Sequence, residues 1–471
     1  MWCMTHTSVP HAGLPDGAHS GAPAPLRSGV DAALDPDYEL AVPKDLDYYG
    51  VFSEVSGEDL DWWTRARDFT SGLEPRMIRH WEHAEYPVDL VREAGRRGLL
   101  TDGVDLGVLS RWPAETEQAG TEQTETQRAG TEQTNAEQID GVENLRTMSP
   151  VAAGLVTMEM SRADGSLGTA LAVQGGLAVR TLAMFGSRDQ KQEHLVRLAT
   201  GETLGAFALT EPEHGSDSVS LETTAQLVGE DGSGYYVLNG AKKWIGNGAS
   251  GGLTFTWARV CGGQYDGEVR CFLVDQGTRG YRAEVIEGKS SLRAIHQALI
   301  QYQDVELPAD AVLPGATSFK DASAVLFATR LGVAWSAVGH AAAVVEAALH
   351  YAGQRKQFSR PLARFQLVQE RLSWMVSELT SMQLHVKQVT ELDAAGRLSG
   401  PQASMAKYHN TRKARQIAQV ARDMLGGNGI LLKNKVARHM ADIEAIHTYE
   451  GTESVQSLII GRDLTGHSAF A

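Results

Sequence analysis

The chain has few cysteines, no excess of positive charge and no long apolar run, and each shortage excludes a class of protein. Its 471 residues include three cysteines, Cys3, Cys261 and Cys271, whose spacing fits neither a disulfide framework nor a metal site. A formal net charge of −15, from 43 Lys and Arg against 58 Asp and Glu, argues against nucleic-acid or anionic-membrane binding. Because no apolar run reaches about 18 residues, we expect no membrane span.

We recognise no targeting signal at either end of the chain. The N-terminal residues lack a charged start followed by an apolar core, and the last five, His-Ser-Ala-Phe-Ala, are not the peroxisomal tripeptide. We therefore expect a cytoplasmic protein with reduced cysteines. Cys261 and Cys271 either face each other across a hairpin or are unpaired residues of a core.

Composition divides the chain into segments. With 42% hydrophobic and 21% charged residues, it is long enough for two or three globular domains. Residues 1–45 are rich in Pro, Gly, Ala and His and lack apolar periodicity, so we expect a disordered tail. Residues 113–141 contain the hexamer AGTEQT twice and almost no large apolar side chain, which predicts a solvated inserted loop.

The apolar periodicity predicts an α+β fold with three domains. Residues 46–203 show helical spacing, as in the run from Trp62 to Trp81, and predict an N-terminal helical domain. Residues 204–318 consist of short β-branched and aromatic runs separated by Gly-rich turns, and predict an all-β domain. Residues 319–471 return to long helical patterns, which predict a helical bundle.

The segment Thr-Tyr-Glu-Gly-Thr at 448–452 holds the strongest candidate for catalysis. Glu450 lies just ahead of a helix-like run, and Gly451 permits a ligand to approach the backbone closely. A carboxylate beside a bound apolar ligand can have a raised pKa and act as a general base on carbon. The alternative is an ordinary helix N-cap turn, in which the helix dipole favours acidic residues.

Four further motifs are candidates for ligand contacts. Residues 207–217, FALTEPEHGSD, end a strand and offer amides and hydroxyls to a polar ligand, or form an ordinary turn. Residues 242–247 place Trp244 on a polar strand edge, where it packs in a core or stacks on a flat cofactor. Residues 355–366 suit a pyrophosphate or form a solvated helix end. Residues 423–430 hold three glycines, of which a plain helix C-cap explains one.

In this order and spacing, the motifs resemble those of the acyl-CoA dehydrogenase family. The resemblance extends from Leu46 to Phe470, apart from the repeat-containing segment. It is strongest with the glutaryl-CoA dehydrogenases and the plant short-chain acyl-CoA oxidases. Both groups share the TYEGT segment, DMLGGNGI or a near variant, and the LPG loop at 313–315. The resemblance implies an N-terminal helical domain, a central antiparallel β-barrel-like domain and a C-terminal four-helix bundle.

The resemblance also implies FAD as the cofactor. The residues that it assigns to FAD are Phe207, Leu209, Thr210, Gly215, Ser216, Trp244, Ile245, Gly246, Arg355, Phe358, Gln366, Asp423, Gly426, Gly427, Thr452 and Ser454. Trp244 and Ile245 would cover one flavin face, and residues 452–454 would meet the phosphates. Arg355, Gln366 and residues 423–427 would reach the FAD of a neighbouring subunit. Shared sites of this kind imply a homodimer or homotetramer.

The same resemblance implies an acyl-CoA substrate and the chemistry performed on it. The residues that it assigns to the substrate are Ser216, Arg330, Gly451, Gly168 and Thr169. Glu450 would remove a proton from the carbon next to the thioester, while a hydride leaves the next carbon for the flavin. Hydrogen bonds to the thioester oxygen would stabilise the developing enolate charge.

The expected reaction is therefore dehydrogenation of a short- or medium-chain acyl-CoA to the trans-2-enoyl-CoA, with electrons passed to an electron-transfer flavoprotein. An acyl-CoA oxidase that uses O2 and a decarboxylating glutaryl-CoA dehydrogenase are alternatives. Glutaryl-specific relatives carry an arginine where our alignment places Gly168, and a buried carboxylate without its cation is costly. A non-catalytic nucleic-acid-binding flavoprotein is a further alternative, but the net charge and the presence of Glu450 argue against it.

Overall fold

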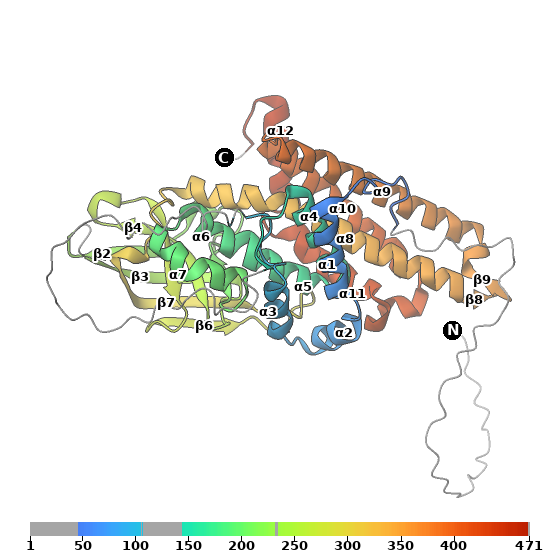
Figure 1. Ribbon diagram of the computed structural model, residues 1–471, viewed down its shortest axis with the longest axis horizontal. Helices are drawn as coiled ribbons and strands as arrows, with labels where there is room; N and C mark the ends of the chain where they lie inside the picture. Colours follow the sequence, from blue (N-terminus) through green and yellow to red (C-terminus); the bar gives the residue numbers. More distant parts are fainter. Residues whose placement is uncertain (1–45, 105, 107–143, 231–233, 470–471) are drawn as a thin grey trace, which may run out of the picture. The chain divides into compact units, whose positions relative to one another are not determined.

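The computed structural model describes residues 46–469, apart from residue 105 and the segments 107–143 and 231–233. The predicted tail at 1–45 and the predicted inserted loop at 113–141 lie outside the described residues. Along the chain, the described part consists of helices, then a β-sheet, then longer helices (Figure 1). This order confirms the fold class expected from the sequence.

The N-terminal helices form because apolar residues recur at helical spacing and bury one face. Trp62, Ala66 and Phe69 are buried in the first helix, and Met77 and Trp81 in the second. The helices are α1 (Gly57–Thr70), α2 (Glu74–His83), α3 (Val88–Arg96), α4 (Pro150–Ala163), α5 (Gly165–Leu171), a π-helix (Ala172–Val179), α6 (Arg180–Phe185) and α7 (Arg188–Ala199). The π-helix continues α5 without a break, and such wide turns occur frequently at functional sites.

The central sheet is mixed rather than wholly antiparallel. Its strands are β1 (Gly205–Ala208), β2 (Thr224–Val228), β3 (Tyr235–Gly246), β4 (Leu253–Cys261), β5 (Val269–Asp275), β6 (Tyr281–Val285) and β7 (Gln297–Pro308). The order is β1-β4-β2-β3-β7-β6, with β5 also paired to β4. Strands β1 and β2 both run parallel to β4, at residues 253–256 and 259–261. Local strand patterns do not reveal this pairing, because the long connection 209–223 lets the chain return in the same direction.

The two cysteines of the sheet are free thiols. Cys271 lies opposite Trp257 in the antiparallel β4–β5 ladder, so it does not face Cys261. Of the two alternatives left by the sequence, the unpaired one is therefore confirmed.

The C-terminal region is built on one long helix and the helices packed against it. Its elements are α8 (Phe319–Gln354), the short strands β8 (Lys356–Gln357) and β9 (Arg360–Pro361), α9 (Gln366–Ala394), α10 (Gly400–Met424), α11 (Val436–Thr448) and α12 (Glu453–Thr465). Helix α8 contacts α9, α10 and α11, and also α4 of the N-terminal region. A Cβ at Gly154 on α4 would lie 2.3 Å from Cε2 of Trp335, so glycine is what lets α4 and α8 approach.

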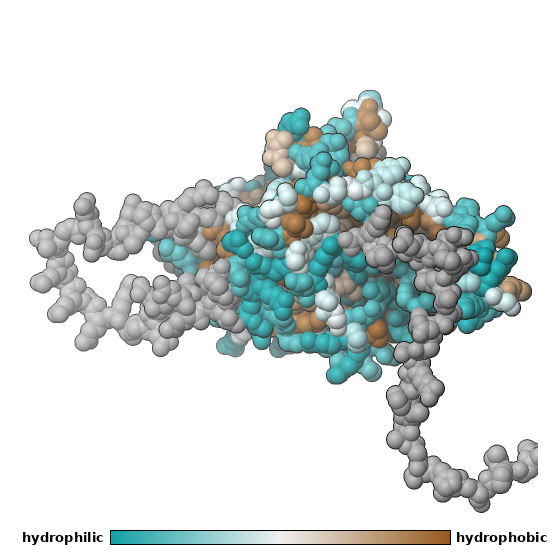
Figure 2. Space-filling view, turned by 45° about the vertical axis from the view of Figure 1, so that its right-hand side comes forward, coloured by the Kyte–Doolittle hydropathy of each residue, from teal (hydrophilic) through white to brown (hydrophobic). Residues whose placement is uncertain are grey.

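Two helical stretches, at 165–185 and 319–354, are long and apolar enough to cross a membrane by length and composition. In their most apolar windows, 67% and 83% of the residues are buried inside the protein, as expected of core helices. On the face shown in Figure 2, hydrophilic residues cover most of the described surface and apolar residues form scattered groups. The apolar character of these helices is therefore directed mainly into the core.

Candidate active site

A cavity lies between the sheet and the helices and opens to solvent, and its volume of about 1200 Å³ includes part of that solvent. Its walls come from α5 and the π-helix, from β1 and the loop after it, and from the end of β3 and the start of β7. Helix α8, the turn before α12 and the first turn of α12 complete them. The predicted site residues that line it are Thr169, Phe207, Leu209, Thr210, Gly215, Ser216, Trp244, Ile245, Gly246, Arg330, Glu450 and Gly451. Motifs that are far apart in the sequence therefore meet at one place.

The remaining predicted residues lie elsewhere on the chain. Thr452 and Ser454 line a separate open cavity of about 690 Å³ at the start of α12. The residues that line neither cavity are Gly168, Arg355, Phe358, Gln366, Asp423, Gly426 and Gly427. All except Gly168 were assigned to the same cofactor by resemblance, several of them through a neighbouring subunit. Phe358, on the β8–β9 hairpin, is 88% exposed. A single chain does not test this assignment, which stays a prediction.

Gly168, which the resemblance assigns to the substrate, is not among the residues that line the cavity. A Cβ at this position would lie 2.4 Å from Oγ of Ser161, so the position faces α4 and not the cavity. Gly168 is buried within α5, in a place with no room for a longer side chain. The resemblance to glutaryl-specific relatives identifies position 168 but not the face of α5 on which it lies. That face decides whether a side chain at this position reaches the ligand.

Glu450 is held at the cavity wall by a hydroxyl from α8. Oγ1 of Thr329 donates a hydrogen bond of 2.8 Å to Oε2 of the carboxylate. Burial raises the pKa of Glu450 above its ordinary value, although Thr329, Lys407 and Arg330 favour the charged form, and Asp102 adds to the rise. A carboxylate with these properties, beside an apolar cavity, is suited to accept a proton from carbon.

The backbone of the turn that carries Glu450 is unusual. Glu450 has φ +52° and Gly451 has φ +86°, so two successive residues adopt the left-handed region. Nε2 of Gln456, which is buried in α12, donates to both of their carbonyl oxygens, at 3.0 Å each. Thr452 caps α12 by accepting a hydrogen bond from the amide of Val455. The turn is thus bound to the first turn of the helix that follows it.

Helix α11, which leads into this turn, is anchored by a buried carboxylate. Asp442 accepts hydrogen bonds from Nε1 of Trp81 at 3.0 Å and from the amide of Leu292 at 2.6 Å. Burial and the nearby Asp164 raise the pKa of Asp442 to about 8. These contacts connect α11 to α2 and to the loop before β7, so the N-terminal helices and the sheet both help to place Glu450.

A buried ion pair shapes the loop after β1. Oε1 of Glu211 lies 2.8 Å from Nζ of Lys242 on β3, and both side chains are almost fully buried. Glu211 also accepts from the amides of Glu222 and Thr223, and Lys242 donates to the carbonyl of Leu209. Burial alone would raise the pKa of Glu211, but Lys242 and the amide of Glu222 outweigh it and lower the pKa. The pair fixes the start of the loop that lines the cavity.

Trp244 stands apart from the buried tryptophans of the core. Its side chain is 54% exposed, lines the cavity, and belongs to a residue with φ +66° at the end of β3. A large ring left open beside a cavity, on a strained backbone, indicates a ligand contact rather than a packing role.

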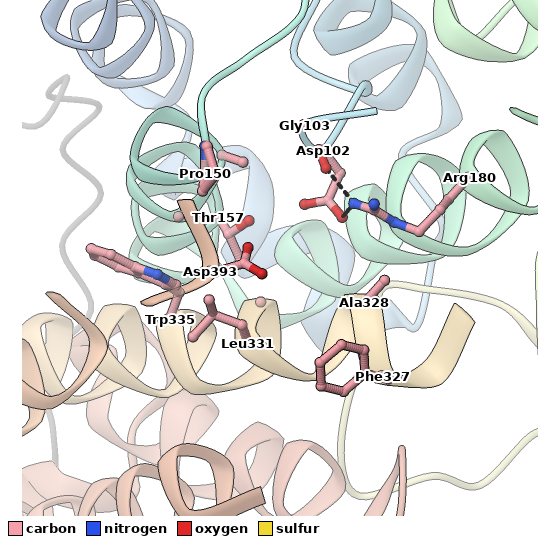
Figure 3. Close-up of a pocket in the computed structure, with 13 residues that line it drawn as sticks. Asp102, Gly103, Pro150, Thr157, Arg180, Phe327, Ala328, Leu331, Trp335 and Asp393 are labelled. Atoms are coloured by element: carbon pink, nitrogen blue, oxygen red, sulfur yellow. Dashed lines mark hydrogen bonds and ion pairs between the residues drawn. The ribbon is translucent and has the colours of Figure 1, made fainter. Parts of the chain in front are cut away.

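A third cavity, whose volume of about 670 Å³ includes open solvent, lies on another face of α8. Figure 3 shows Asp102 and Arg180 paired on one side of it, with Leu331 and Phe327 on α8 and Trp335 at the far end. Nη2 of Arg180 lies 3.1 Å from Oδ2 of Asp102. Asp102 contributes to the raised pKa of Glu450, so this carboxylate acts electrostatically on the first cavity.

Sequence reasoning missed several polar residues of the site and most of the apolar wall. The missed polar residues are Ser218, Gln297, Thr329, Lys407, Tyr449 and Gln456. The apolar lining residues that it missed are Ala172, Val173, Leu177, Leu326 and Val455. Gln456 follows the TYEGT segment by one helical turn and could have been found from that spacing. Thr329 and Lys407 lie within long helical patterns that give no signal of a site.

Comparison with known proteins places these features in a family. Residues 128–202 match the N-terminal domain of acyl-CoA dehydrogenases, residues 206–305 the middle domain and residues 319–465 the C-terminal domain. An acyl-CoA dehydrogenase of Bacillus subtilis (strain 168) is 34% identical over 66% of this chain and 82% of its own length. The human mitochondrial short-chain specific acyl-CoA dehydrogenase is 31% identical over 67% of this chain and 76% of its own length.

A similar structure has also been solved with a flavin. The glutaryl-CoA dehydrogenase of Mycobacterium smegmatis in complex with FADH2 has a TM-score of 0.78 and 32% sequence identity. The match covers 91% of this chain and 99% of that chain. With all three domains matched in order, the chain belongs to the acyl-CoA dehydrogenase family.

Proposed function

We propose that this protein catalyses the α,β-dehydrogenation of short- or medium-chain acyl-CoA thioesters to the trans-2-enoyl-CoA. The observation that carries the proposal is the position of Glu450, a buried carboxylate with a raised pKa at the wall of an apolar cavity. The same cavity is also lined by the loop after β1 and by Trp244. One group is thus suited to take a proton, and space for a flat cofactor lies beside it.

FAD is the cofactor of the family, and the residues of this chain fit it. The exposed ring of Trp244, with Ile245 next to it, would cover one face of the flavin. Thr210 and Ser216 would offer polar groups at the ring edge. When bound there, FAD would supply the acceptor for the hydride that leaves the β-carbon of the acyl group.

The chain itself supplies the base and the environment for it. Glu450 takes the proton from the α-carbon, and Thr329 holds the carboxylate through its other oxygen. The apolar side chains of Val173, Leu177 and Leu326 exclude water from the acyl group. Exclusion of water keeps Glu450 basic enough to act near neutral pH.

The lining of the cavity favours an apolar acyl chain. Among the described residues that line it, Arg330 is the cation, and its Nη1 donates to Oγ of Ser404 at 3.1 Å. The glutaryl-CoA alternative needs a cation for the distal carboxylate, and the position of Gly168 has no room to provide one. We therefore favour saturated, uncharged acyl groups over glutaryl-CoA.

We further propose that an electron-transfer flavoprotein reoxidises the enzyme and that the protein acts in the cytoplasm. The relatives described above are named dehydrogenases, which supports this acceptor over O2. Reoxidation of the reduced enzyme in air, with and without an acceptor dye, tests the choice. Rapid turnover with O2 alone would identify an oxidase instead.

The substrate proposal predicts a clear preference among thioesters. With a dye acceptor, we expect kcat/KM for butyryl-CoA or hexanoyl-CoA to exceed that for glutaryl-CoA by at least about 10²-fold, because a buried carboxylate without a cation loses several kcal/mol. A panel of straight-chain, branched and dicarboxylic acyl-CoA substrates measures this. Equal rates with glutaryl-CoA and release of CO2 would identify the decarboxylating alternative.

The raised pKa of Glu450 predicts the direction of the pH dependence. Protonated Glu450 cannot accept the α-proton, so kcat/KM should fall as the pH drops through a pKa above the ordinary glutamate value. The charged groups that act on Glu450 are Lys407, Arg330 and Asp102. Because Asp102 raises this pKa, Asp102→Asn should move the acid limb of the pH profile to lower pH. If the acid limb of the kcat/KM profile does not move in Asp102→Asn, Asp102 does not raise the pKa of Glu450.

A further inference from the structure

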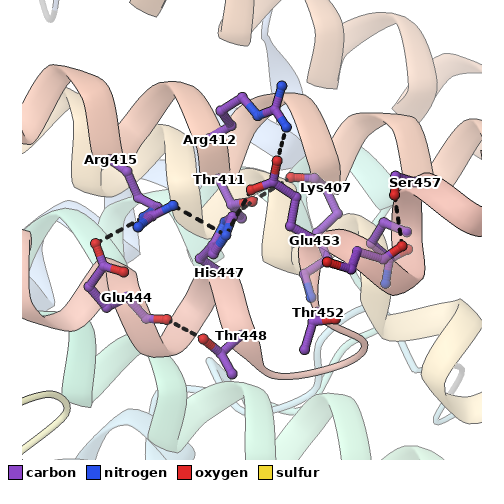
Figure 4. Close-up of polar contacts among 12 residues, drawn as sticks. Lys407, Thr411, Arg412, Arg415, Glu444, His447, Thr448, Thr452, Glu453 and Ser457 are labelled. Carbon is purple, nitrogen blue, oxygen red and sulfur yellow. Dashed lines mark hydrogen bonds and ion pairs between the residues drawn. The ribbon is translucent and has the colours of Figure 1, made fainter. Parts of the chain in front are cut away.

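We propose that Lys407 is the positioning residue of the catalytic base, because it binds the two carbonyl groups that flank Glu450. This inference rests on the proposed function. Nζ of Lys407 donates to the carbonyl oxygens of Tyr449 and Gly451, one on each side of the base. Figure 4 shows Lys407 on α10, beside the connection between α11 and α12.

The position of Lys407 is unusual for a lysine. It is 1% exposed, and lysines are rarely buried so fully without a carboxylate partner in direct contact. Here the direct partners are backbone carbonyls, and Glu450 acts on the ammonium only through its charge. Burial lowers the pKa of Lys407 to about 7, while Glu450 opposes the shift. A lysine kept in this buried place, with its donors on the turn of the base, indicates a purpose beyond packing.

The backbone that Lys407 binds is the strained one. Glu450 adopts the left-handed region, which side chains other than glycine rarely occupy, and Gly451 follows it there. Such a conformation persists when surrounding groups fix it from several sides. Lys407 fixes the turn from α10, and Gln456 fixes it from α12. Between them, the carbonyls of Tyr449, Glu450 and Gly451 are all bound.

Helix α10 acts on the site at two places, one turn apart. Ser404 accepts a hydrogen bond from Arg330, which lines the cavity, and Lys407 binds the turn of the base three residues later. Both residues are buried on the face of α10 that is turned to α8 and α12. Helix α10 therefore directs two polar side chains, Ser404 and Lys407, toward the active site, and of these two Lys407 can carry a charge.

Lys407 has two effects on the base, and each has its own readout. Its hydrogen bonds hold the carboxylate in place, and its charge favours the carboxylate form of Glu450. Lys407→Met removes donors and charge while keeping most of the length of the unbranched side chain. Lys407→Arg keeps both the charge and the donors. Lys413→Met is the matched control, since Lys413 lies on the same helix and pairs with Glu378 at 3.0 Å.

With the FAD-loaded enzyme, we expect kcat of Lys407→Met to fall about 10²-fold, with KM near the wild-type value, because a displaced base acts poorly. The acid limb of its pH profile should move to higher pH, since the cation that favours the carboxylate is gone. The charged and titratable groups that remain around Glu450 are Arg330, Asp102 and Tyr449. Lys407→Arg should keep the limb in place, and Lys413→Met should change neither quantity.

Amide hydrogen exchange supplies a readout that does not depend on activity. We expect a peptide spanning residues 448–457 to exchange faster in Lys407→Met and at the wild-type rate in Lys413→Met. If the exchange of residues 448–457 is unchanged in Lys407→Met, the proposal is overturned. It is also overturned if the acid limb of the pH profile stays in place and amide exchange rises equally across the whole protein. If the wild-type enzyme oxidises no acyl-CoA, the proposed function fails, and the exchange data alone still decide whether Lys407 holds the turn.

Discussion

Replacing Glu450 with glutamine should reduce turnover by about 10²–10⁴-fold or more, the range that general base catalysis supplies. The amide has almost the same shape and can still accept the hydrogen bond from Thr329, so the fold and the cavity should persist. What it lacks is the basic oxygen, so the α-proton has no acceptor. The measurement is kcat/KM with butyryl-CoA and a dye acceptor, together with the flavin absorbance of the purified variant.

Glu444→Gln is the matched control for this variant. Glu444 lies on α11, six residues before Glu450, and its exposed carboxylate pairs with Arg415 at 2.9 Å. We expect near wild-type activity from it, because surface ion pairs contribute little. Glu450→Gln with full flavin content and turnover within about tenfold of wild type would contradict the role of Glu450 as the base.

Lys242→Met should lower the free energy of unfolding by about 3–5 kcal/mol, because it leaves the carboxylate of Glu211 buried without its cation. Glu211 would keep its hydrogen bonds from the amides of Glu222 and Thr223, but these do not replace a charge. The loop that begins at Glu211 lines the cavity, so the variant should also retain less FAD. Urea denaturation and the ratio of flavin to protein absorbance measure the two effects.

Two further variants separate the cost of an unpaired charge from the loss of a contact. The double variant Glu211→Gln with Lys242→Met removes both charges and should recover part of the stability. Lys413→Met breaks the more exposed pair with Glu378 and should cost less than about 1 kcal/mol. A cost of Lys242→Met as small as that of Lys413→Met would show that the buried pair is not a major source of stability.

The sequence alone was sufficient to predict features that depend on residues close together in the chain. The buried face of α1 follows from the spacing of Trp62, Ala66 and Phe69, and the turn at Glu450 follows from the TYEGT segment. The parallel pairing of β1 and β2 with β4 was not predictable in this way, because partners such as Gly205 and Leu253 are brought together by the fold. Local periodicity predicts the individual helices and strands. The packing between them is visible only in the structure.

The same distinction separates the site residues that were predicted from those that were missed. Glu450, Trp244 and the residues after β1 belong to short, distinctive segments. Thr329 lies 121 residues from Glu450 in the sequence, and Lys407 lies 44 residues from Gly451. Each is an ordinary polar residue in a long helix, and only the crossing of α8 and α10 beside the last turn gives it a role.

The π-helix limits how the acyl-binding wall could be redesigned. Val173 and Leu177 project into the cavity, whereas Gly175 and Gly176 face the other way. A methyl group at Gly175 would lie 2.3 Å from the carbonyl oxygen of Leu100, and one at Gly176 would lie 2.9 Å from Oδ2 of Asp102. Libraries that aim at longer or bulkier thioesters should therefore diversify positions 173 and 177 and leave the glycine pair untouched.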